Sequence, residues 1–227
     1  MMKFLLFLLI LWSSAFNSCV ADAADRVPQR CLRAAEKMKL VTVNYNYGEL
    51  KFDASKTAAQ ISQVCSDQAA GCFYSTSGSF RNIAVTPIEV DGGCRTFQIK
   101  VDFDFTGSVL YITNEYGPCE TRAVLRHELQ HFMNWKASKE QVIRETKIAL
   151  KRWSIKNMKE CKKENECSSA DYRYGATSEA AQIVSNILEK WNAIGEKNNI
   201  QLDAVDHNVD KEMNYSVCAA YSLKIVR

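Results

Sequence analysis

Two segments in the first half of the chain alternate between apolar and polar side chains. Residues 41–47 read VTVNYNY and residues 97–105 read FQIKVDFDF. A period of two buries one face of a strand and leaves the other in water, as in an antiparallel sheet. Asp91-Gly92-Gly93 separates IAVTPIEV from CRTFQIKVDFDF and indicates a hairpin. We therefore expect an antiparallel sheet in the N-terminal half, with a short helix over 55–65.

The second half of the chain changes to the spacing of helices. Gly117-Pro118 precedes ETRAVLRHELQHFMNW, and proline is favoured at the first position of a helix. Residues 138–141, SKEQ, match a capping box and predict the start of a second helix. Thr177 or Ser178 is expected to open a third. Strands followed by helices predict an α+β fold, in which the antiparallel sheet of the N-terminal half packs with helices of the C-terminal half.

The first predicted helix carries the sequence HELQH at 127–131. Positions i and i+4 share one helix face about 5–6 Å apart, so His127 and His131 can hold one zinc ion. Glu128 is next to this face and can act as the general base that takes a proton from water. Zinc lowers the pKa of a bound water toward about 7. The motif is typical of a zincin-like active-site helix, with zinc as cofactor and Glu128 as the catalytic residue.

A catalytic zinc ion usually has three protein ligands and one open position. The first candidate for the third ligand is His207, the only other histidine, which follows Asp206. Glu179, in GATSEAAQI, and Asp171, in DYRYG, are alternatives. Glu145 is a further carboxylate that can turn inward from the second predicted helix. The local sequence leaves this choice open.

Three features together resemble a bacterial family of predicted secreted zinc-dependent proteases: the strand CRTFQIKV at 94–101, VLRHELQHF at 124–132, and a long helix after it. Members of that family carry H-E-x-x-H-F and, near the C-terminus, a stretch similar to Y-D-x-x-T-x-H-G. The corresponding residues 202–208 read LDAVDHN, without the tyrosine, threonine and glycine and with a spacing one residue shorter. The resemblance implies a zinc protease with His207 as a ligand, and it names no substrate.

The N-terminus indicates export. Lys3 precedes an apolar run over 4–12, and Ala21-Asp22-Ala23 offers a cleavage site, so residues 1–23 are predicted to be a signal peptide. The run is shorter than the roughly 20 residues of a membrane span. A rival interpretation makes Cys19 the first residue of a lipoprotein, but the preceding Phe-Asn-Ser matches a lipidation site poorly. Residues 24–227 suffice for a single domain, secreted or periplasmic.

Cysteine content agrees with an oxidising compartment. Cleavage after the signal peptide leaves eight cysteines, and an even number in an exported chain suggests up to four disulfides. Sequence alone does not fix their connectivity. The pairs expected here are Cys65–Cys72 and Cys161–Cys167 as local loops, with Cys94–Cys119 and Cys31–Cys218 as longer links.

Charge argues against one class of partner. The net charge of +3 is small and spread along the chain, which does not resemble a nucleic-acid-binding surface. The function expected first is therefore a secreted zinc metallopeptidase that acts on protein or peptide substrates. Two alternatives remain: a zinc amidase acting on cell-wall peptides, and a disulfide-rich secreted binding protein without enzymatic activity.

Overall fold

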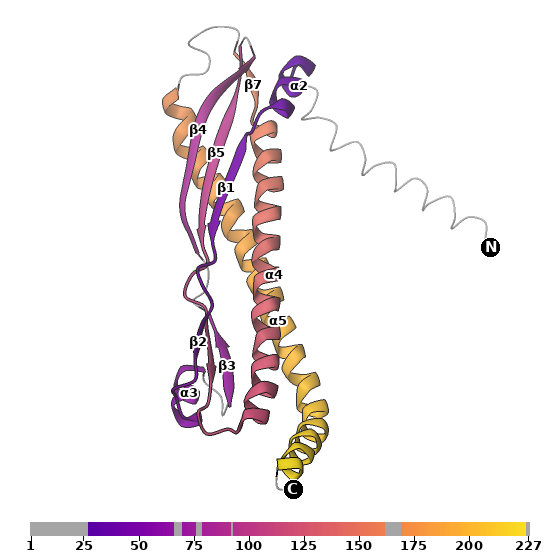
Figure 1. Cartoon of the computed structure of the whole chain (residues 1–227). Coiled ribbons are helices and arrows are strands. Elements are labelled where there is room, and N and C mark those ends of the chain that lie inside the picture. The colour runs from indigo at the N-terminus through magenta and orange to yellow at the C-terminus, as the bar shows by residue number, and fades with distance from the viewer. Residues whose placement is uncertain (1–26, 66–69, 76–78, 92, 162–168, 226–227) are drawn as a thin grey trace, which may run out of the picture. The chain divides into compact units, whose positions relative to one another are not determined.

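The computed structural model describes residues 27–65, 70–75, 79–91, 93–161 and 169–225, with the backbone alone at 79, at 91, in 169–174 and in 205–225 (Figure 1). These residues confirm the α+β class, because most strands precede the two long helices. The helices are α2 (Gln29–Lys37), α3 (Ala58–Cys65), α4 (Pro118–Lys156) and α5 (Ser169–Ile225). The strands are β1 (Val41–Asn46), β2 (Lys51–Asp53), β3 (Gly71–Tyr74), β4 (Ser79–Asp91), β5 (Cys94–Asp104), β6 (Val109–Ile112) and β7 (Lys159–Glu160).

The strands form two sheets. In one, the strand order is β1-β5-β4, and β7 also pairs with β5 in antiparallel fashion. In the other, the order is β2-β6-β3, where β2 runs parallel to β6 and β3 antiparallel to it. The prediction of a purely antiparallel sheet is therefore wrong. A parallel pair needs a long crossover, and α3, β3, β4 and β5 all lie between β2 and β6 in the sequence.

The described residues belong to two compact units. Unit 1 takes residues from Met1–Thr42, Ile83–Lys100 and Lys147–Gln182, and unit 2 takes them from Val43–Asn82, Val101–Thr146 and Ile183–Arg227. Strand β5 and helices α4 and α5 contribute residues to both units. The single domain expected over 24–227 stays a prediction, and the expected signal peptide over 1–23 lies outside the described residues.

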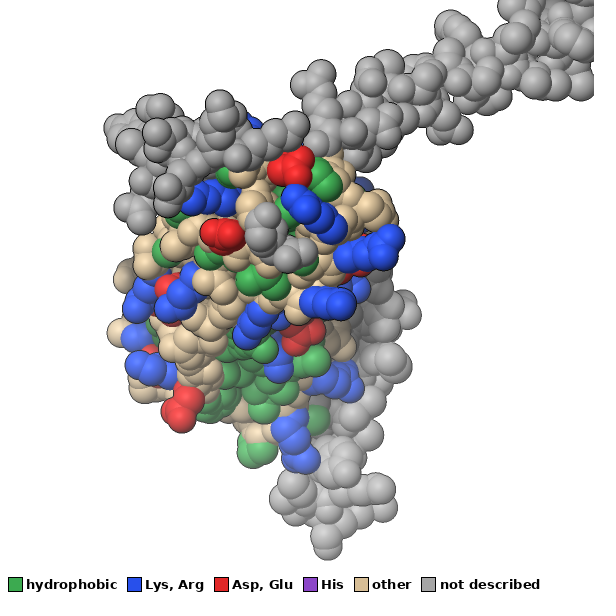
Figure 2. Space-filling view, turned by 90° about the horizontal axis from the view of Figure 1, so that it is seen from above, with side chains coloured by type: hydrophobic (Ala, Val, Ile, Leu, Met, Phe, Trp, Pro, Cys, Tyr) green, Lys and Arg blue, Asp and Glu red, His purple; other side chains and the backbone are tan. Residues whose placement is uncertain are grey.

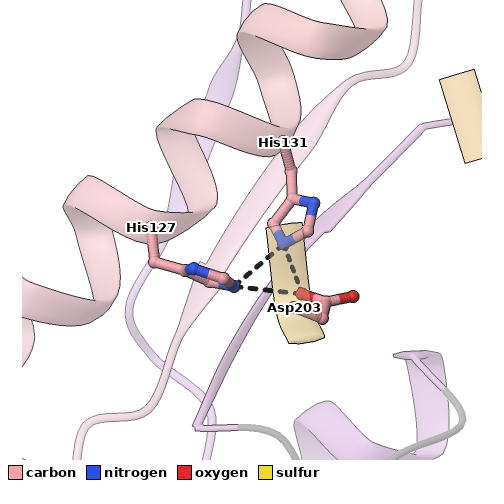
Figure 3. A group of neighbouring side chains, drawn as sticks. All are labelled: His127, His131 and Asp203. Carbon is pink, nitrogen blue, oxygen red and sulfur yellow. Dashed lines mark hydrogen bonds and ion pairs between the residues drawn. The ribbon is translucent and has the colours of Figure 1, made fainter. Parts of the chain in front are cut away.

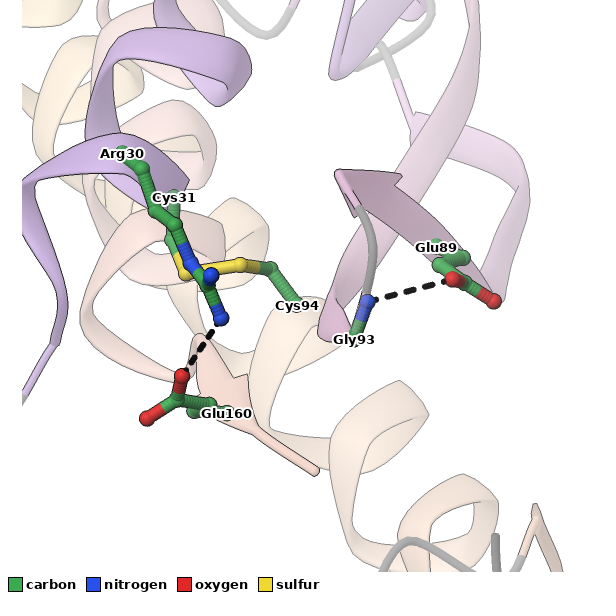
Figure 4. The surroundings of a disulfide bond; sticks show 6 residues. All are labelled: Arg30, Cys31, Glu89, Gly93, Cys94 and Glu160. Atoms are coloured by element: carbon green, nitrogen blue, oxygen red, sulfur yellow. Dashed lines mark hydrogen bonds and ion pairs between the residues drawn. A yellow bond between two sulfur atoms is a disulfide. The ribbon is translucent and has the colours of Figure 1, made fainter. Parts of the chain in front are cut away.

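In unit 1, Cys31 of α2 and Cys94 of β5 form a disulfide (Figure 4), and both cysteines belong to a buried apolar cluster. Leu40 and Met158 are buried in the same cluster. Close by, Gly93 N–H donates to Glu89 Oε1 over 3.2 Å. Gly93 has a φ of +106°, a conformation that favours glycine. This glycine ends the turn between β4 and β5, as the sequence predicted for a hairpin.

Strand β5 follows the predicted alternation closely. Its apolar positions Phe97, Ile99, Val101 and Phe103 are all buried, whereas Gln98 and Lys100 between them are exposed. The buried threonine on the same strand is also satisfied, since Thr96 Oγ1 donates to the backbone oxygen of Ser154 in α4 over 2.6 Å. The periodic pattern thus identified both the strand and its buried face.

Unit 2 has an aromatic core that joins the strands to helix α4. Trp135 of α4 lies between Tyr47, Phe73 and Phe105, with ring centroids 5.7–6.4 Å apart. Phe132, one turn earlier on the helix, stacks on Trp135 at 5.9 Å. Offset and edge-to-face aromatic pairs of this kind add stabilisation beyond their buried area. These aromatic contacts fix which face of α4 packs on the strands, and therefore how the HELQH residues are oriented on that helix.

Two predicted helix starts are wrong. Helix α4 runs without interruption through the predicted capping box, and Ser138 Oγ donates to the backbone oxygen of Trp135 within this helix instead of capping a new one. Helix α5 begins at Ser169, earlier than the expected start at Thr177 or Ser178. Pro118 is the first residue of α4, as predicted.

The disulfide predictions are partly confirmed. Cys65–Cys72 forms as expected, with its Cα atoms 6.4 Å apart. Cys31 pairs with Cys94, so the expected pairs Cys94–Cys119 and Cys31–Cys218 are both wrong. Connectivity depends on which cysteines the fold brings within bonding distance, which the sequence does not give. Cys119 and Cys161 are also disulfide-bonded, whereas the side chains of Cys167 and Cys218 lie outside the described residues.

Disulfides of this kind fit the predicted export. Among the helices that the structure describes, none combines the length and apolar character needed to cross a membrane. Figure 2 shows one face of the molecule, on which Lys and Arg side chains are scattered among neutral and apolar ones rather than gathered into one cluster.

Candidate metal centre

Helix α4 presents the HELQH sequence in unit 2. Its first residue is Pro118, and Glu120 lies in its first turn, where an acidic side chain suits the positive end of the helix dipole. His127 and His131 are one turn apart and project from the same face, as the spacing predicted. Their ring centroids are 4.6 Å apart. His131 is buried, with an exposed fraction of 8%, and His127 is partly buried.

A carboxylate from helix α5 completes a three-residue cluster. The Oδ1 atom of Asp203 lies 3.2 Å from His127 Nε2 and 2.9 Å from His131 Nε2, and the two Nε2 atoms are 2.9 Å apart (Figure 3). Among the described residues, this is the only group of three or more His, Cys, Asp or Glu side chains whose ligand atoms come close enough to share a metal ion.

The three atoms fit a single zinc ion. A triangle with sides of 2.9, 2.9 and 3.2 Å has a circumscribed radius of about 1.7 Å. That radius is shorter than zinc–nitrogen and zinc–carboxylate distances of about 2.0–2.2 Å, so one point lies at bonding distance from all three atoms. Two imidazoles and one carboxylate also match the composition of known catalytic zinc sites, in which a fourth position stays open.

Glu128 lies next to this cluster and is buried, with an exposed fraction of 6%. Burial raises the pKa of its carboxyl group, because desolvation disfavours the charged form. The neighbouring His131 and His127 oppose that shift, as does a hydrogen bond from the backbone N–H of Phe73, while Asp203 adds to it. Glu128 is therefore a carboxylate held beside the ligand atoms in an environment that favours proton uptake.

Two of the alternative ligands have other partners. Glu179 accepts a hydrogen bond from Trp153 Nε1 over 3.0 Å in unit 1. Glu145 forms an ion pair with Lys190 over 2.9 Å, and this hydrogen bond lowers the pKa of the Glu145 carboxyl. Neither belongs to the cluster of His127, His131 and Asp203.

The side chains of the remaining candidates, His207 and Asp171, lie outside the described residues. The backbone of α5 is nevertheless helical through 203–207. His207 therefore follows Asp203 by one helical turn, on the same side of the helix axis. The role of His207 as a ligand stays a prediction.

Asp203 was missed by the sequence analysis although it lies in the stretch 202–208 that was matched to the protease family. One signal pointed to it. In a helix, an aspartate four residues before a candidate histidine ligand lies on the same face as that histidine. Because this part of the chain was not predicted to be helical, the four-residue spacing of Asp203 and His207 did not lead to a prediction of Asp203 as a ligand.

Comparisons with known proteins add no assignment. No family model, no curated protein and no solved structure matches this chain. The resemblance to secreted zinc-dependent proteases therefore remains a prediction from the sequence motif, and the case for function rests on the geometry of the cluster.

Proposed function

We propose that this protein is a secreted zinc-dependent metallopeptidase, with His127, His131 and Asp203 as zinc ligands and Glu128 as general base. The observation that carries the proposal is the convergence of two Nε2 atoms and one carboxylate oxygen within 3.2 Å of one another, beside a buried glutamate. With the imidazole protons on Nδ1, both Nε2 atoms and the Asp203 carboxylate oxygen each offer a lone pair to one shared cation. His207 is retained as a further candidate ligand.

When bound, zinc would act as a Lewis acid that polarises the substrate carbonyl and lowers the pKa of a coordinated water. Glu128 takes the proton of the attacking water on a carboxylate oxygen. It then releases that proton to the nitrogen of the departing amine. Its position beside the three ligand atoms suits both steps, because the same carboxylate can reach the attacking water and the departing amine.

The substitution Glu128→Gln tests this role. We expect the variant to keep its fold and its zinc, because the amide has the same shape and Glu128 is not a ligand. Hydrolysis of a diverse synthetic peptide mixture, followed by mass spectrometry, should fall roughly 10²- to 10⁴-fold. The matched control is Glu179→Gln, a change of the same kind outside the cluster, which should hydrolyse like the parent. Equal hydrolysis by Glu128→Gln and the parent would refute the mechanism.

The burial of Glu128 also fits a second function. A buried carboxylate that accepts a backbone N–H can simply stabilise the fold, as expected for a disulfide-rich binding protein without enzymatic activity. That alternative predicts that the zinc-loaded parent leaves the peptide mixture intact. It also predicts that Glu128→Gln lowers the free energy of unfolding. Cleavage of purified cell-wall material but not of the peptide mixture would instead favour the zinc amidase.

A further inference from the structure

Strand β3 lies close against helix α4 at Gly71, beside Glu128. A Cβ atom added to Gly71 would lie 2.4 Å from Val124 Cγ1, 3.0 Å from the backbone oxygen of Tyr111 and 3.2 Å from Glu128 Cγ. Val124 and Glu128 are four residues apart and share one face of α4. No side chain larger than hydrogen fits at Gly71 without moving the strand away from this face.

Two residues further along the same strand, the backbone N–H of Phe73 hydrogen-bonds the Glu128 carboxylate. Residues two apart in a strand point their backbone groups toward the same edge. The opposite edge of β3 pairs with β6, where Phe73 is in register with Leu110. The edge that carries the Phe73 N–H is therefore directed at α4, and Glu128 supplies its acceptor.

We infer that strand β3 positions the general base: the Phe73 N–H orients the Glu128 carboxylate, and Gly71 allows the strand to come close enough. A glutamate side chain has three rotatable bonds, and burial alone does not select one orientation of its carboxylate. A hydrogen bond to one carboxylate oxygen selects one orientation, and it leaves the second carboxylate oxygen available for proton transfer. The inference rests on the proposed role of Glu128 in hydrolysis. The contact between β3 and Glu128 does not depend on that role.

The Cys65–Cys72 disulfide supports the same arrangement. Cys72 lies between Gly71 and Phe73 in β3, and its disulfide ties the strand to the end of helix α3. Thr113 N–H also donates to the backbone oxygen of Ala70 over 2.8 Å, just before the strand begins. The disulfide at Cys72 and the hydrogen bond at Ala70 thus hold strand β3 on either side of Gly71, which lies beside Glu128.

The substitution Gly71→Ala tests the positioning role. The added methyl group should push β3 away from α4 and lower kcat about 10- to 100-fold, because a displacement of about 1 Å is enough for such a loss. KM and zinc content should stay close to the parent, because the three atoms nearest to the added methyl group belong to Val124, Tyr111 and Glu128 and to none of the proposed ligands. The matched control is Gly175→Ala, where an added Cβ meets nothing within 4 Å.

A second substitution should reverse part of the effect. Valine has a stiff side chain in a helix, so the clash with Val124 Cγ1 is not relieved by rotation at low cost. Gly71→Ala combined with Val124→Ala removes the shortest contact and should recover part of kcat, while the 3.0 Å contact with Tyr111 persists. A kcat of Gly71→Ala equal to that of the parent, or no recovery in the double variant, would overturn the inference.

Amide hydrogen exchange tests the contact without any activity measurement. In Glu128→Ala the Phe73 amide should exchange faster than in the parent, whereas Glu128→Gln should keep it protected through the side-chain carbonyl oxygen. The Thr113 amide, which bonds to Ala70, should be unchanged in both variants. Unchanged protection of Phe73 in Glu128→Ala, or equal loss at Thr113, would refute the positioning role. If the parent hydrolyses nothing, the proposed function fails, and this measurement still decides whether the contact exists.

Discussion

At the scale of single residues, Lys139 is an instructive buried charge in unit 2. Its exposed fraction is 3%, and its Nζ atom donates to Asn192 Oδ1. The same atom lies 5.9 Å from the ring centroids of both Phe105 and Trp135. Burial lowers the pKa of Lys139 below its usual value of 10.5, because a low-dielectric setting disfavours the ammonium form.

This lowered pKa predicts how stability changes with pH. Between the folded-state pKa and 10.5, the unfolded chain binds more protons at Lys139 than the folded chain does. The free energy of unfolding should therefore rise with pH across that window, relative to a Lys139→Met variant, in which the group is absent. Urea unfolding of both proteins at neutral and alkaline pH measures the difference. An identical pH dependence in the two proteins would contradict the assignment of a buried charge.

The residues of the candidate site were predictable only where they lie close together in the chain. His127, Glu128 and His131 follow from one helical turn, because helix geometry fixes which residues share a face. Asp203 comes from another helix, and its meeting with the histidines depends on how α4 and α5 pack within unit 2. Phe73 enters through a backbone N–H, which no side-chain pattern reveals.

At the scale of secondary structure elements, local periodicity succeeded where one buried face dominates. It located β1 and β5, but the buried face of β1 is incomplete, since Tyr45 is 52% exposed. The preference of proline for the first helical position correctly placed Pro118 at the start of α4. The capping-box motif at Ser138 predicted a helix start that does not exist, since α4 continues through it and Ser138 Oγ bonds to a backbone oxygen of the same helix. The parallel pairing of β2 with β6 was also missed, because it is a long-range contact.

The two disulfides with identified partners should differ in their effect on stability. The Cys31–Cys94 bond spans 63 positions and the Cys65–Cys72 bond spans 7. Loop-closure entropy assigns them roughly 4 and 2 kcal/mol respectively. Replacing Cys31 and Cys94 by serine should therefore lower the free energy of unfolding by about 2 kcal/mol more than replacing Cys65 and Cys72. Denaturant unfolding of both double variants measures this order, and the reverse order would contradict it.

At the scale of the whole molecule, the α+β class was correctly predicted. The described residues divide into two compact units, and the single domain expected over 24–227 stays a prediction. The elements that span both units carry no break in composition that would mark a boundary. The proposed ligands and Glu128 all belong to unit 2, whereas the Cys31–Cys94 disulfide belongs to unit 1. The proposed metal site and the Cys31–Cys94 disulfide thus belong to different units.

Zinc content shows whether His127, His131 and Asp203 together hold one zinc ion. The mature chain, carrying Glu128→Gln to prevent self-cleavage, would be loaded with zinc, dialysed and analysed by mass spectrometry. The further substitutions His131→Ala and Asp203→Ala would be compared with Glu179→Gln as control. We predict about one zinc per chain in the parent and the control, and a sharp loss in the other two, since each removes one ligand. Zinc retained equally by Asp203→Ala, or no zinc in a folded parent, would contradict the binding of one zinc ion by these three residues.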